Sequence, residues 1–439
     1  MGYGFHAYGN DYWCSDVPAD YPFNLVCDRA NYGTYSQTAF MLGYVVSGLV
    51  FSHYSDKYGR RPTVWAAFGV EILGIIICIL SPNIFLYSFA RFLVASGGTG
   101  RGNAIYVTCG IGWVVGYAIV PGLAYWLQDY RYMQLVSVVV LVLMVFWYYY
   151  MFESPRWLIT NGYVDRAEHT LRKALKMNGK SDKNLKQQLT ELSDHLKEIQ
   201  AKEKPLKDIT VLDVIKTPKL RKVSLIIWYS LTVIALLYYG LSFNMADFGG
   251  NFYITFLLSG LAELPAQLLT ALFMRFIGRR KLFAIFMVIT GLSSLAVIPS
   301  RSEWLKVTWA LVSKFGVGSA WNVMAIMGPE LYPTVLRQRG MGAAFVIARV
   351  GAIFGPFMKN LTATYGLAFV MVMYGTLAFI SAILALFMPE TKGKEIPDTI
   401  EEAEHVSGIS LPLVSGINNA NIADINARVP YITITNARP

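Results

Sequence analysis

The sequence predicts an all-α membrane protein made of two hydrophobic halves. Hydrophobic residues make up 54% of the 439 residues and charged residues only 15%, whereas a soluble domain carries about 25% charged residues. A second observation is a set of short charged motifs that recurs at matching points of two apolar halves. The alternating polarity of a membrane β-barrel is absent from the sequence.

Eleven apolar segments are long enough to cross a bilayer. A spanning helix needs about 20 apolar residues, and inside lipid every backbone amide must be satisfied within its own segment, which favours helices. The expected spans are 34–55, 63–81, 84–107, 108–127, 131–151, 222–243, 250–274, 282–299, 305–328, 341–359 and 363–388.

An approximate repeat relates the two halves. The first half carries SDKYGRRP at residues 55–62 and ends in FESPRWL at 152–158. The second carries RFIGRRK at 275–281 and ends in MPETKGK at 388–394. Each half therefore has an apolar span, a Gly-Arg-Arg turn, further spans and an exit motif that contains glutamate. An internal repeat in a polytopic membrane protein is typical of a secondary transporter that holds its substrate between the repeats.

The net charge of +10 indicates topology. Basic residues gather in short loops at 57–61, 275–281 and 337–339, while the other short links carry few of them. Basic loops stay in the cytoplasm, so we expect both Gly-Arg-Arg turns on that side. Charge divided among separate loops does not form the single basic face of a nucleic-acid-binding protein, so we expect no nucleic-acid partner.

This topology divides the chain into five regions. We expect an extracellular segment, an incomplete N-terminal transmembrane half, a cytoplasmic linker with short amphipathic helices, a C-terminal transmembrane half, and a largely disordered cytoplasmic tail. The expected boundaries are 1–33, 34–151, 152–221, 222–388 and 389–439.

The charged motifs predict a breakable latch at the cytoplasmic end of each half. A carboxylate beside guanidinium groups at a membrane–water boundary can form an ion pair that opens and closes. The alternative is that the arginines only anchor helix ends by snorkelling, which does not account for the repeated carboxylates. The candidate latch residues are Asp56, Gly59, Arg60, Arg61, Glu153, Arg156, Arg279, Arg280, Glu330, Arg337 and Glu390.

The order of the motifs carries a family resemblance. The motifs are NLVCDR (24–29), SDKYGRRP, RFLVASGGTG (91–100), FESPRWL, YYGL (238–241), ELPA (263–266), PELYPTVLRQRGMG (329–342), ARVGAIFGPF (348–357) and PETKGKEIPDT (389–399). Over about residues 10–402 the chain resembles the major facilitator superfamily and, within it, the organic cation, organic anion and carnitine-type carriers.

The resemblance implies a bundle of two six-helix halves that moves small organic ions across the plasma membrane by alternating access. It implies no enzymatic activity and no cofactor, and the sequence shows no ATP-binding motif, so energy would come from exchange or ion gradients. The expected partners are a small organic ion, the lipid bilayer and other membrane subunits.

Two departures from the family open an alternative. Family members have twelve spans, and here the first span and the loop between spans four and five are missing, since span four runs into span five near 107–110. The chain would then be a truncated, non-transporting form that acts as a binding or regulatory membrane protein. An organic cation carrier is a further alternative.

Arg349 is the strongest candidate for recognition of substrate charge. It lies in an apolar span with no carboxylate nearby in sequence, and a charge inside a span is a functional hypothesis by default. In the family, the corresponding position is acidic in cation carriers and basic in anion and carnitine-type carriers. Arginine binds carboxylates through a bidentate fork, which favours an anionic or zwitterionic substrate. The alternative is a structural pair between Arg349 and Glu263 or another helix.

Three further polar residues lie within spans. Glu263 and Gln267 are one helical turn apart and can face the same side. Anion carriers that the sequence resembles often have lysine where this chain has Gln267, which is a departure from the family. Glu263 would receive an ammonium group or pair across helices, and Lys314 would bind substrate or snorkel to the outer boundary.

Aromatic residues complete the expected substrate site. Amphipathic rings suit flat organic ions and quaternary ammonium groups. We select Tyr238, Tyr239 and Trp321 as substrate-binding candidates, because their spans match the helices that line the cavity in the family. Tyr117 is interpreted as a packing or interfacial aromatic.

The cysteines predict no metal site. Cys14 and Cys27 lie in the first thirty residues, which we expect outside the cell, where a disulfide is permitted. They form either one disulfide or two free thiols. Cys78 and Cys109 lie in apolar runs, and no metal-ligand spacing occurs in the sequence.

Overall fold

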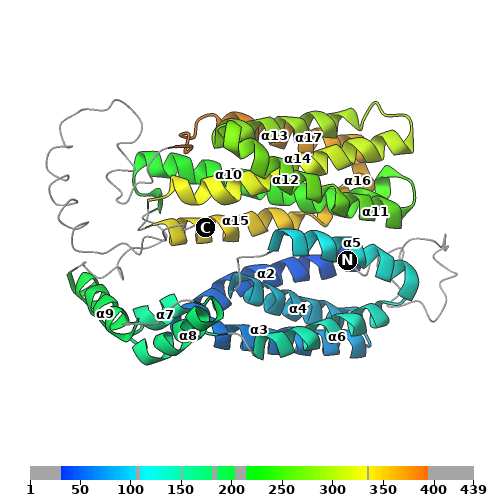
Figure 1. Ribbon diagram of the computed structural model, residues 1–439. Coiled ribbons are helices and arrows are strands. Elements are labelled where there is room, and N and C mark those ends of the chain that lie inside the picture. The colour runs from blue at the N-terminus through cyan, green and yellow to red at the C-terminus, as the bar shows by residue number, and fades with distance from the viewer. Residues whose placement is uncertain are drawn as a thin grey trace, which may run out of the picture.

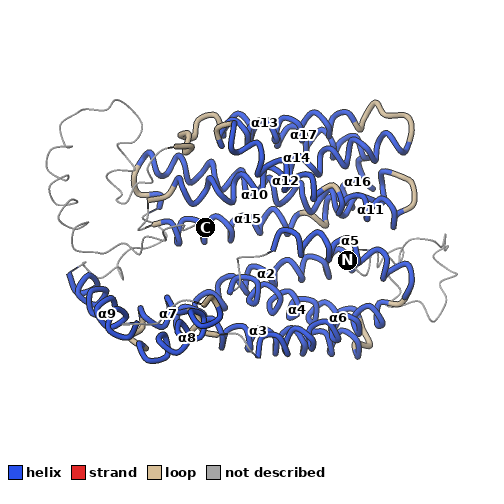
Figure 2. The backbone as a smooth tube through the Cα atoms, in the orientation of Figure 1, coloured by secondary structure: helices blue, strands red, loops and turns tan. Residues whose placement is uncertain are grey.

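The structure is a computed structural model in which only helices form regular structure among the described residues (Figure 2). The described residues are 31–104, 109–149, 152–179, 185–202, 214–333 and 336–393. Figure 1 shows two helical halves side by side, with a small group of helices at one end.

Five long helices form the N-terminal half. They are α2 (Asn31–Tyr58), α3 (Arg60–Leu80), α4 (Ile84–Ala104), α5 (Cys109–Leu127) and α6 (Tyr130–Tyr149). Within this half α4 packs against both α2 and α3, and α6 packs against α3. Gly74 permits the close approach of α3 and α4, since a Cβ there would lie 2.8 Å from the backbone nitrogen of Val94. Small residues are the usual means by which membrane helices pack closely.

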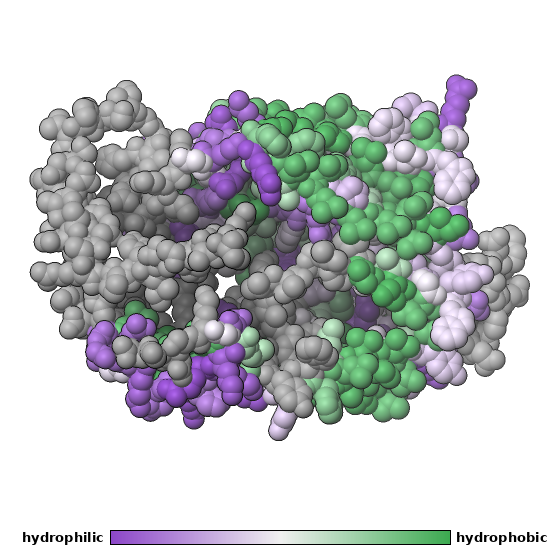
Figure 3. Space-filling model, in the orientation of Figure 1, coloured by the Kyte–Doolittle hydropathy of each residue, from purple (hydrophilic) through white to green (hydrophobic). Residues whose placement is uncertain are grey.

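Three short helices follow at one end of the bundle. They are α7 (Pro155–Thr160), α8 (Val164–Met177) and α9 (Leu185–Lys202). Figure 3 shows hydrophilic side chains gathered over this group, whereas the side of the bundle is largely apolar. We call the end that carries α7–α9 and both Gly-Arg-Arg turns the basic end.

The C-terminal half holds the remaining elements. They are α10 (Pro218–Phe243), η5 (Asn244–Phe248), α11 (Phe252–Leu261), α12 (Glu263–Phe276), α13 (Arg279–Ala296), α14 (Glu303–Leu331), α15 (Arg337–Phe354), α16 (Phe357–Tyr365) and α17 (Leu367–Ala385). Two of its spans are broken into helix pairs, α11–α12 and α15–α16. Pro265 and Pro356 follow or occupy the breaks, and proline removes a helical hydrogen bond and clashes with the preceding turn.

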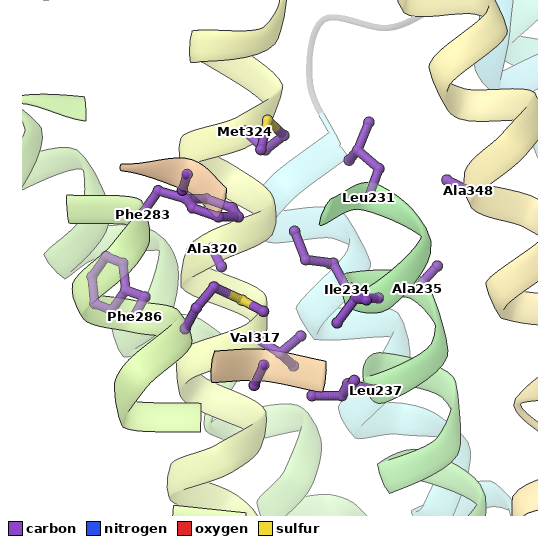
Figure 4. Close-up of a cluster of buried hydrophobic side chains, with 14 of the residues drawn as sticks. Leu231, Ile234, Ala235, Leu237, Phe283, Phe286, Val317, Ala320, Met324 and Ala348 are labelled. Atoms are coloured by element: carbon purple, nitrogen blue, oxygen red, sulfur yellow. The ribbon is translucent and has the colours of Figure 1, made fainter. Parts of the chain in front are cut away.

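The main hydrophobic core lies in the C-terminal half (Figure 4). Leu231, Ile234 and Leu237 of α10 point toward Val317 of α14, and all four are at most 1% exposed. Phe283 and Phe286 of α13 close the opposite side of this cluster (Figure 4). The core fixes α10 and α14, the two helices that carry most of the buried polar residues described below.

The apolar helices support a membrane location. Among the described residues, six spans are long and apolar enough to cross a bilayer, and three shorter apolar helices lie at 84–98, 115–127 and 130–146. Each of the eleven expected ranges falls on one helix or on a broken pair. The number of eleven spans stays a prediction.

Candidate functional site

In the first half, Glu153 of the exit motif binds the start of α3. Its carboxylate oxygens accept hydrogen bonds from the backbone nitrogens of Arg60 at 2.9 Å and Arg61 at 3.0 Å. The first amides of a helix have no partner inside the helix and favour a negative charge. Gly59 makes room for this contact, because its φ of 97° is open to glycine, and a Cβ there would lie 2.6 Å from Glu153 Oε2.

The second half repeats this arrangement. Glu390 accepts from the backbone nitrogen of Arg280 at the start of α13, at 3.5 Å. The same oxygen accepts from the backbone nitrogens of Thr391 at 3.2 Å and Lys392 at 3.3 Å. Gly278 leaves the space that Glu390 fills. The matching glutamates of both exit motifs therefore bind the starts of the matching helices.

The second arginine of each turn binds the end of another helix. Arg61 Nη2 donates to the backbone oxygen of Tyr149, at the end of α6, at 3.2 Å. Arg280 Nη1 donates to the oxygens of Leu386 at 3.3 Å and Met388 at 3.1 Å, just beyond α17. Cations are favourable at helix C-termini. The expected partners thus meet through backbone groups rather than through direct carboxylate–guanidinium pairs.

One direct ion pair lies at the basic end of the second half. Arg279 Nη1 of α13 pairs with Glu330 Oε2 of α14, and both side chains are partly buried. Arg337 begins α15 at the same end. In the first half, Asp56 lies in α2 and Arg156 in α7, but their side chains lie outside the described part of the structure.

A buried cluster surrounds Lys314 in the C-terminal half. Lys314 of α14 has an exposed fraction of 0%, and Glu263 of α12 is 6% exposed. Lys314 Nζ lies 3.8 Å from Glu263 Oε1 and donates to the hydroxyl of Ser242 on α10. The Tyr238 hydroxyl donates to the same Glu263 oxygen at 2.6 Å. This pairing makes the burial of both charges tolerable.

Two aromatic rings also contact the Lys314 ammonium. Nζ lies 4.2 Å from the ring centre of Tyr238 and 5.0 Å from that of Tyr117, within the range of cation–π attraction. Tyr117 belongs to α5 of the opposite half and stacks on Phe256 of α11 with centres 4.7 Å apart. Gly260 on α11 leaves the space for the Tyr117 ring. The cluster therefore joins the two halves.

Arg349 lies at a second contact between the halves. Its guanidinium carbon is 4.9 Å from the ring centre of Tyr44 on α2. Arg91 of α4 donates to Gln37 at 2.9 Å and lies 4.4 Å from the ring centre of Phe40. Within the described residues, no carboxylate forms an ion pair with Arg349, and Glu263 is paired with Lys314 instead.

The other sequence-predicted residues lie around these two contacts. Tyr239 meets Tyr238 edge to face at 5.4 Å and acts electrostatically on Tyr44, so it lies between the Lys314 cluster and Arg349. Gln267 lies one turn after Glu263 on α12. The Trp321 ring of α14 lies 6.1 Å from that of Phe345.

The remaining contacts between halves lie at the end opposite the basic end. Thr34 of α2 donates to Asn360 Oδ1 of α16 at 3.2 Å, and Asn360 Nδ2 donates to Asn31 at 2.9 Å. Tyr125 of α5 meets Tyr253 of α11 at 5.5 Å. No side-chain contact between the halves is found at the basic end among the residues that the structure describes.

Several contact residues were not selected from sequence. Ser242, Tyr44 and Gln37 are ordinary polar residues of apolar helices, and Tyr117 was interpreted as a packing aromatic. The signal that singles out Tyr117 is spatial, because it needs the neighbouring Lys314 and Gly260 from the other half. Cys14 and Cys27 lie outside the described residues, and Cys78 is a buried free thiol.

Comparison with known proteins places the chain in a family. Residues 97–403 match the family described as Sugar (and other) transporter. An organic cation transporter protein of Drosophila melanogaster is 31% identical over 404 residues, covering 87% of this chain and 73% of that protein. Solute carrier family 22 member 3 of Mus musculus is 31% identical over 408 residues, covering 89% and 72%.

A solved structure shares the fold. The inward-open conformation of the xylose transporter XylE from E. coli matches with a TM-score of 0.64 at 16% identity, over 86% of this chain and 90% of that chain. The predicted all-helical fold and the membrane location are confirmed, and the chain is a multi-pass transporter of organic ions rather than an enzyme. It belongs to the major facilitator superfamily and, within it, to the organic ion transporter family.

Proposed function

We propose that the protein carries anionic or zwitterionic organic molecules across the plasma membrane by alternating access. The observation that carries the charge preference is the pairing of Lys314 with Glu263. This pair neutralises Glu263, the acidic candidate of the site. Arg349 then remains as a guanidinium that faces Tyr44 rather than a carboxylate.

The charges near Tyr44 support the same preference. Arg349, Arg91 and Glu71 all act electrostatically on Tyr44, and their formal charges sum to about +1 if each is ionised. An anionic group would balance this excess, and arginine suits it because its donors match a carboxylate fork. Tyr44 and Tyr239 offer ring faces beside the same charge, which suits a flat organic anion.

The contacts between halves support alternating access. The halves touch from the Lys314 cluster to Asn360 at the end opposite the basic end. If the basic end faces the cytoplasm, as the basic loops predict, this arrangement is closed toward the outside. Transport would require these contacts to break while the Gly-Arg-Arg ends of the two halves approach each other.

An organic cation carrier is the second candidate. The Drosophila relative is named an organic cation transporter protein, and Glu263 lies beside the ring of Tyr238. A cation could use this carboxylate and ring only if the Lys314 ammonium left them. The present geometry therefore favours the anion.

Uptake measurements in cells that express the chain test the proposal. The labelled substrates are an organic anion such as p-aminohippurate, an organic cation such as tetraethylammonium, and carnitine, with surface expression measured in parallel. The proposal predicts uptake of the anion or of carnitine above the level of untransfected cells. Uptake of the cation alone, or no uptake at clear surface expression, would contradict it.

A further inference from the structure

The surroundings of Lys314 resemble a ligand site more than a simple ion pair. The nearest carboxylate oxygen is 3.8 Å from Nζ, longer than the 2.7–2.9 Å or so of a direct charge-assisted hydrogen bond. That oxygen already accepts from the Tyr238 hydroxyl at 2.6 Å. The ammonium is instead surrounded by a hydroxyl, a carboxylate and two ring faces.

This set of groups suits an ammonium ion in general. Aromatic faces with a nearby carboxylate recognise alkylammonium and quaternary ammonium groups, because both supply negative potential without requiring several strong hydrogen bonds. Four helices from both halves contribute the groups, namely α5, α10, α12 and α14. A structural ion pair between α12 and α14 would not need Tyr117 from the opposite half.

We propose that Glu263, Tyr238, Tyr117 and Ser242 form an ammonium-binding site that the chain fills with its own Lys314 side chain. Lys314 thereby excludes organic cations and is a specificity-determining residue. The inference rests on the proposed function, because it assumes that this cluster lies on the path of the transported ion. It narrows the proposed substrates to anions, since a zwitterion would find its ammonium site occupied.

Chemical rescue tests the site without a transport assay. Lys314→Ala removes the lysine stem and ammonium, and n-butylammonium has the four carbons and charge that the lysine side chain supplies. The experiment measures thermal unfolding of the purified full-length variant in detergent with increasing n-butylammonium. n-Butanol serves as a neutral probe of the same length, and Lys314→Ala/Glu263→Gln serves as the variant without the carboxylate.

The proposal predicts a saturable rise of at least about 2 °C in the unfolding temperature of Lys314→Ala with n-butylammonium. It predicts no such rise for the wild type, for the double variant, or with n-butanol. An equal rise in the wild type or the double variant, an equal rise with n-butanol, or no rise in Lys314→Ala would overturn the proposal.

A second variant covers the case in which Lys314→Ala does not fold. Lys314→Ser keeps a hydroxyl near Glu263 and leaves room for the same probe. Recovery of either variant only when n-butylammonium is present during purification counts as rescue and supports the site. If neither variant is recovered even with the probe, the ligand does not replace the side chain and the proposal is wrong. Because binding is measured directly, the result stands even if the wild type carries no organic anion.

Discussion

The ammonium group of Lys314 lies 3.8 Å from the carboxylate of Glu263. This relationship decides how charge is distributed between the halves. Glu263 would otherwise be the natural partner for a cationic substrate or for Arg349, yet its negative charge is balanced within the C-terminal half. Arg349 consequently faces the N-terminal half through the ring of Tyr44, with its positive charge unbalanced by any carboxylate among the described residues.

Gly59→Ala is expected to destabilise the protein. Gly59 has φ 97° and ψ 170°, a region that is essentially restricted to glycine and costs other residues about 1–3 kcal/mol. The added Cβ would also displace Glu153 from the start of α3. Thermal unfolding in detergent should show a clear drop in the unfolding temperature. Gly69→Ala is the matched control on α3, because its Cβ would meet nothing within 4 Å; equal behaviour of the two variants would argue against the cap.

The Arg279–Glu330 pair is expected to show energetic coupling. Both side chains are partly buried, so a double-mutant cycle with Arg279→Gln and Glu330→Gln should give a coupling of about 1 kcal/mol in the free energy of unfolding. Arg60→Gln is the control in the first half, because the bond from Arg60 to Glu153 runs through its backbone nitrogen. Arg60→Gln should change stability by less than about 0.5 kcal/mol. Additive effects of Arg279→Gln and Glu330→Gln would refute the coupling.

Gly260→Ala is expected to reduce transport. A methyl group at Gly260 would occupy the position of the Tyr117 ring, and so separate α5 from α11 where the two halves meet. The expected result is a loss of at least about tenfold in uptake at unchanged surface expression, if closure at this end costs about 1.4 kcal/mol more. Gly116→Ala is the control, since that position beside Tyr117 has open space. Wild-type uptake by Gly260→Ala would show that this contact does not limit the cycle.

Asp247 is expected to make stability depend on pH. Burial raises the pKa of the Asp247 carboxyl in η5 above its ordinary value of 3.8, against the opposing charge of Lys359. The folded protein therefore holds this proton more tightly than the unfolded chain does. Its contribution to stability is full below pH 3.8 and is lost as pH rises through the raised pKa.

Thermal unfolding of the wild type and Asp247→Asn across pH 3.5–7 or so measures this contribution. The wild type should lose stability relative to Asp247→Asn as pH rises, because asparagine remains neutral. A difference between the two proteins that stays constant with pH would contradict the raised pKa. The comparison cancels the titration of all other groups that the two proteins share.

The sequence predicts the helical framework well, because the length of a span and the need to satisfy its backbone are local properties. The expected range 250–274 falls on α11 and α12 together, with a break at Ala262. Pro265 is the local cause, yet the apolar pattern alone continues through the break. The repeat of the Gly-Arg-Arg turns also predicts that matching charged groups meet matching helices.

The details of the site depend on contacts that the sequence does not specify. Nothing in the sequence indicates that Glu263 meets Lys314 rather than Arg349, because the pairing is set by how α12, α14 and α15 pack. The sequence likewise suggests that Glu153 would meet arginine side chains. The positive φ of Gly59 instead turns the first amides of α3 toward this carboxylate.

The most direct test of the central claim is the ratio of organic anion uptake to organic cation uptake in Arg349→Asp compared with the wild type. Surface expression is measured in parallel, and Arg349→Lys serves as the charge-preserving control. If Arg349 sets the charge of the substrate, Arg349→Asp should lower anion uptake and raise cation uptake, while Arg349→Lys keeps the wild-type preference. An unchanged ratio in Arg349→Asp at equal surface expression would contradict the account.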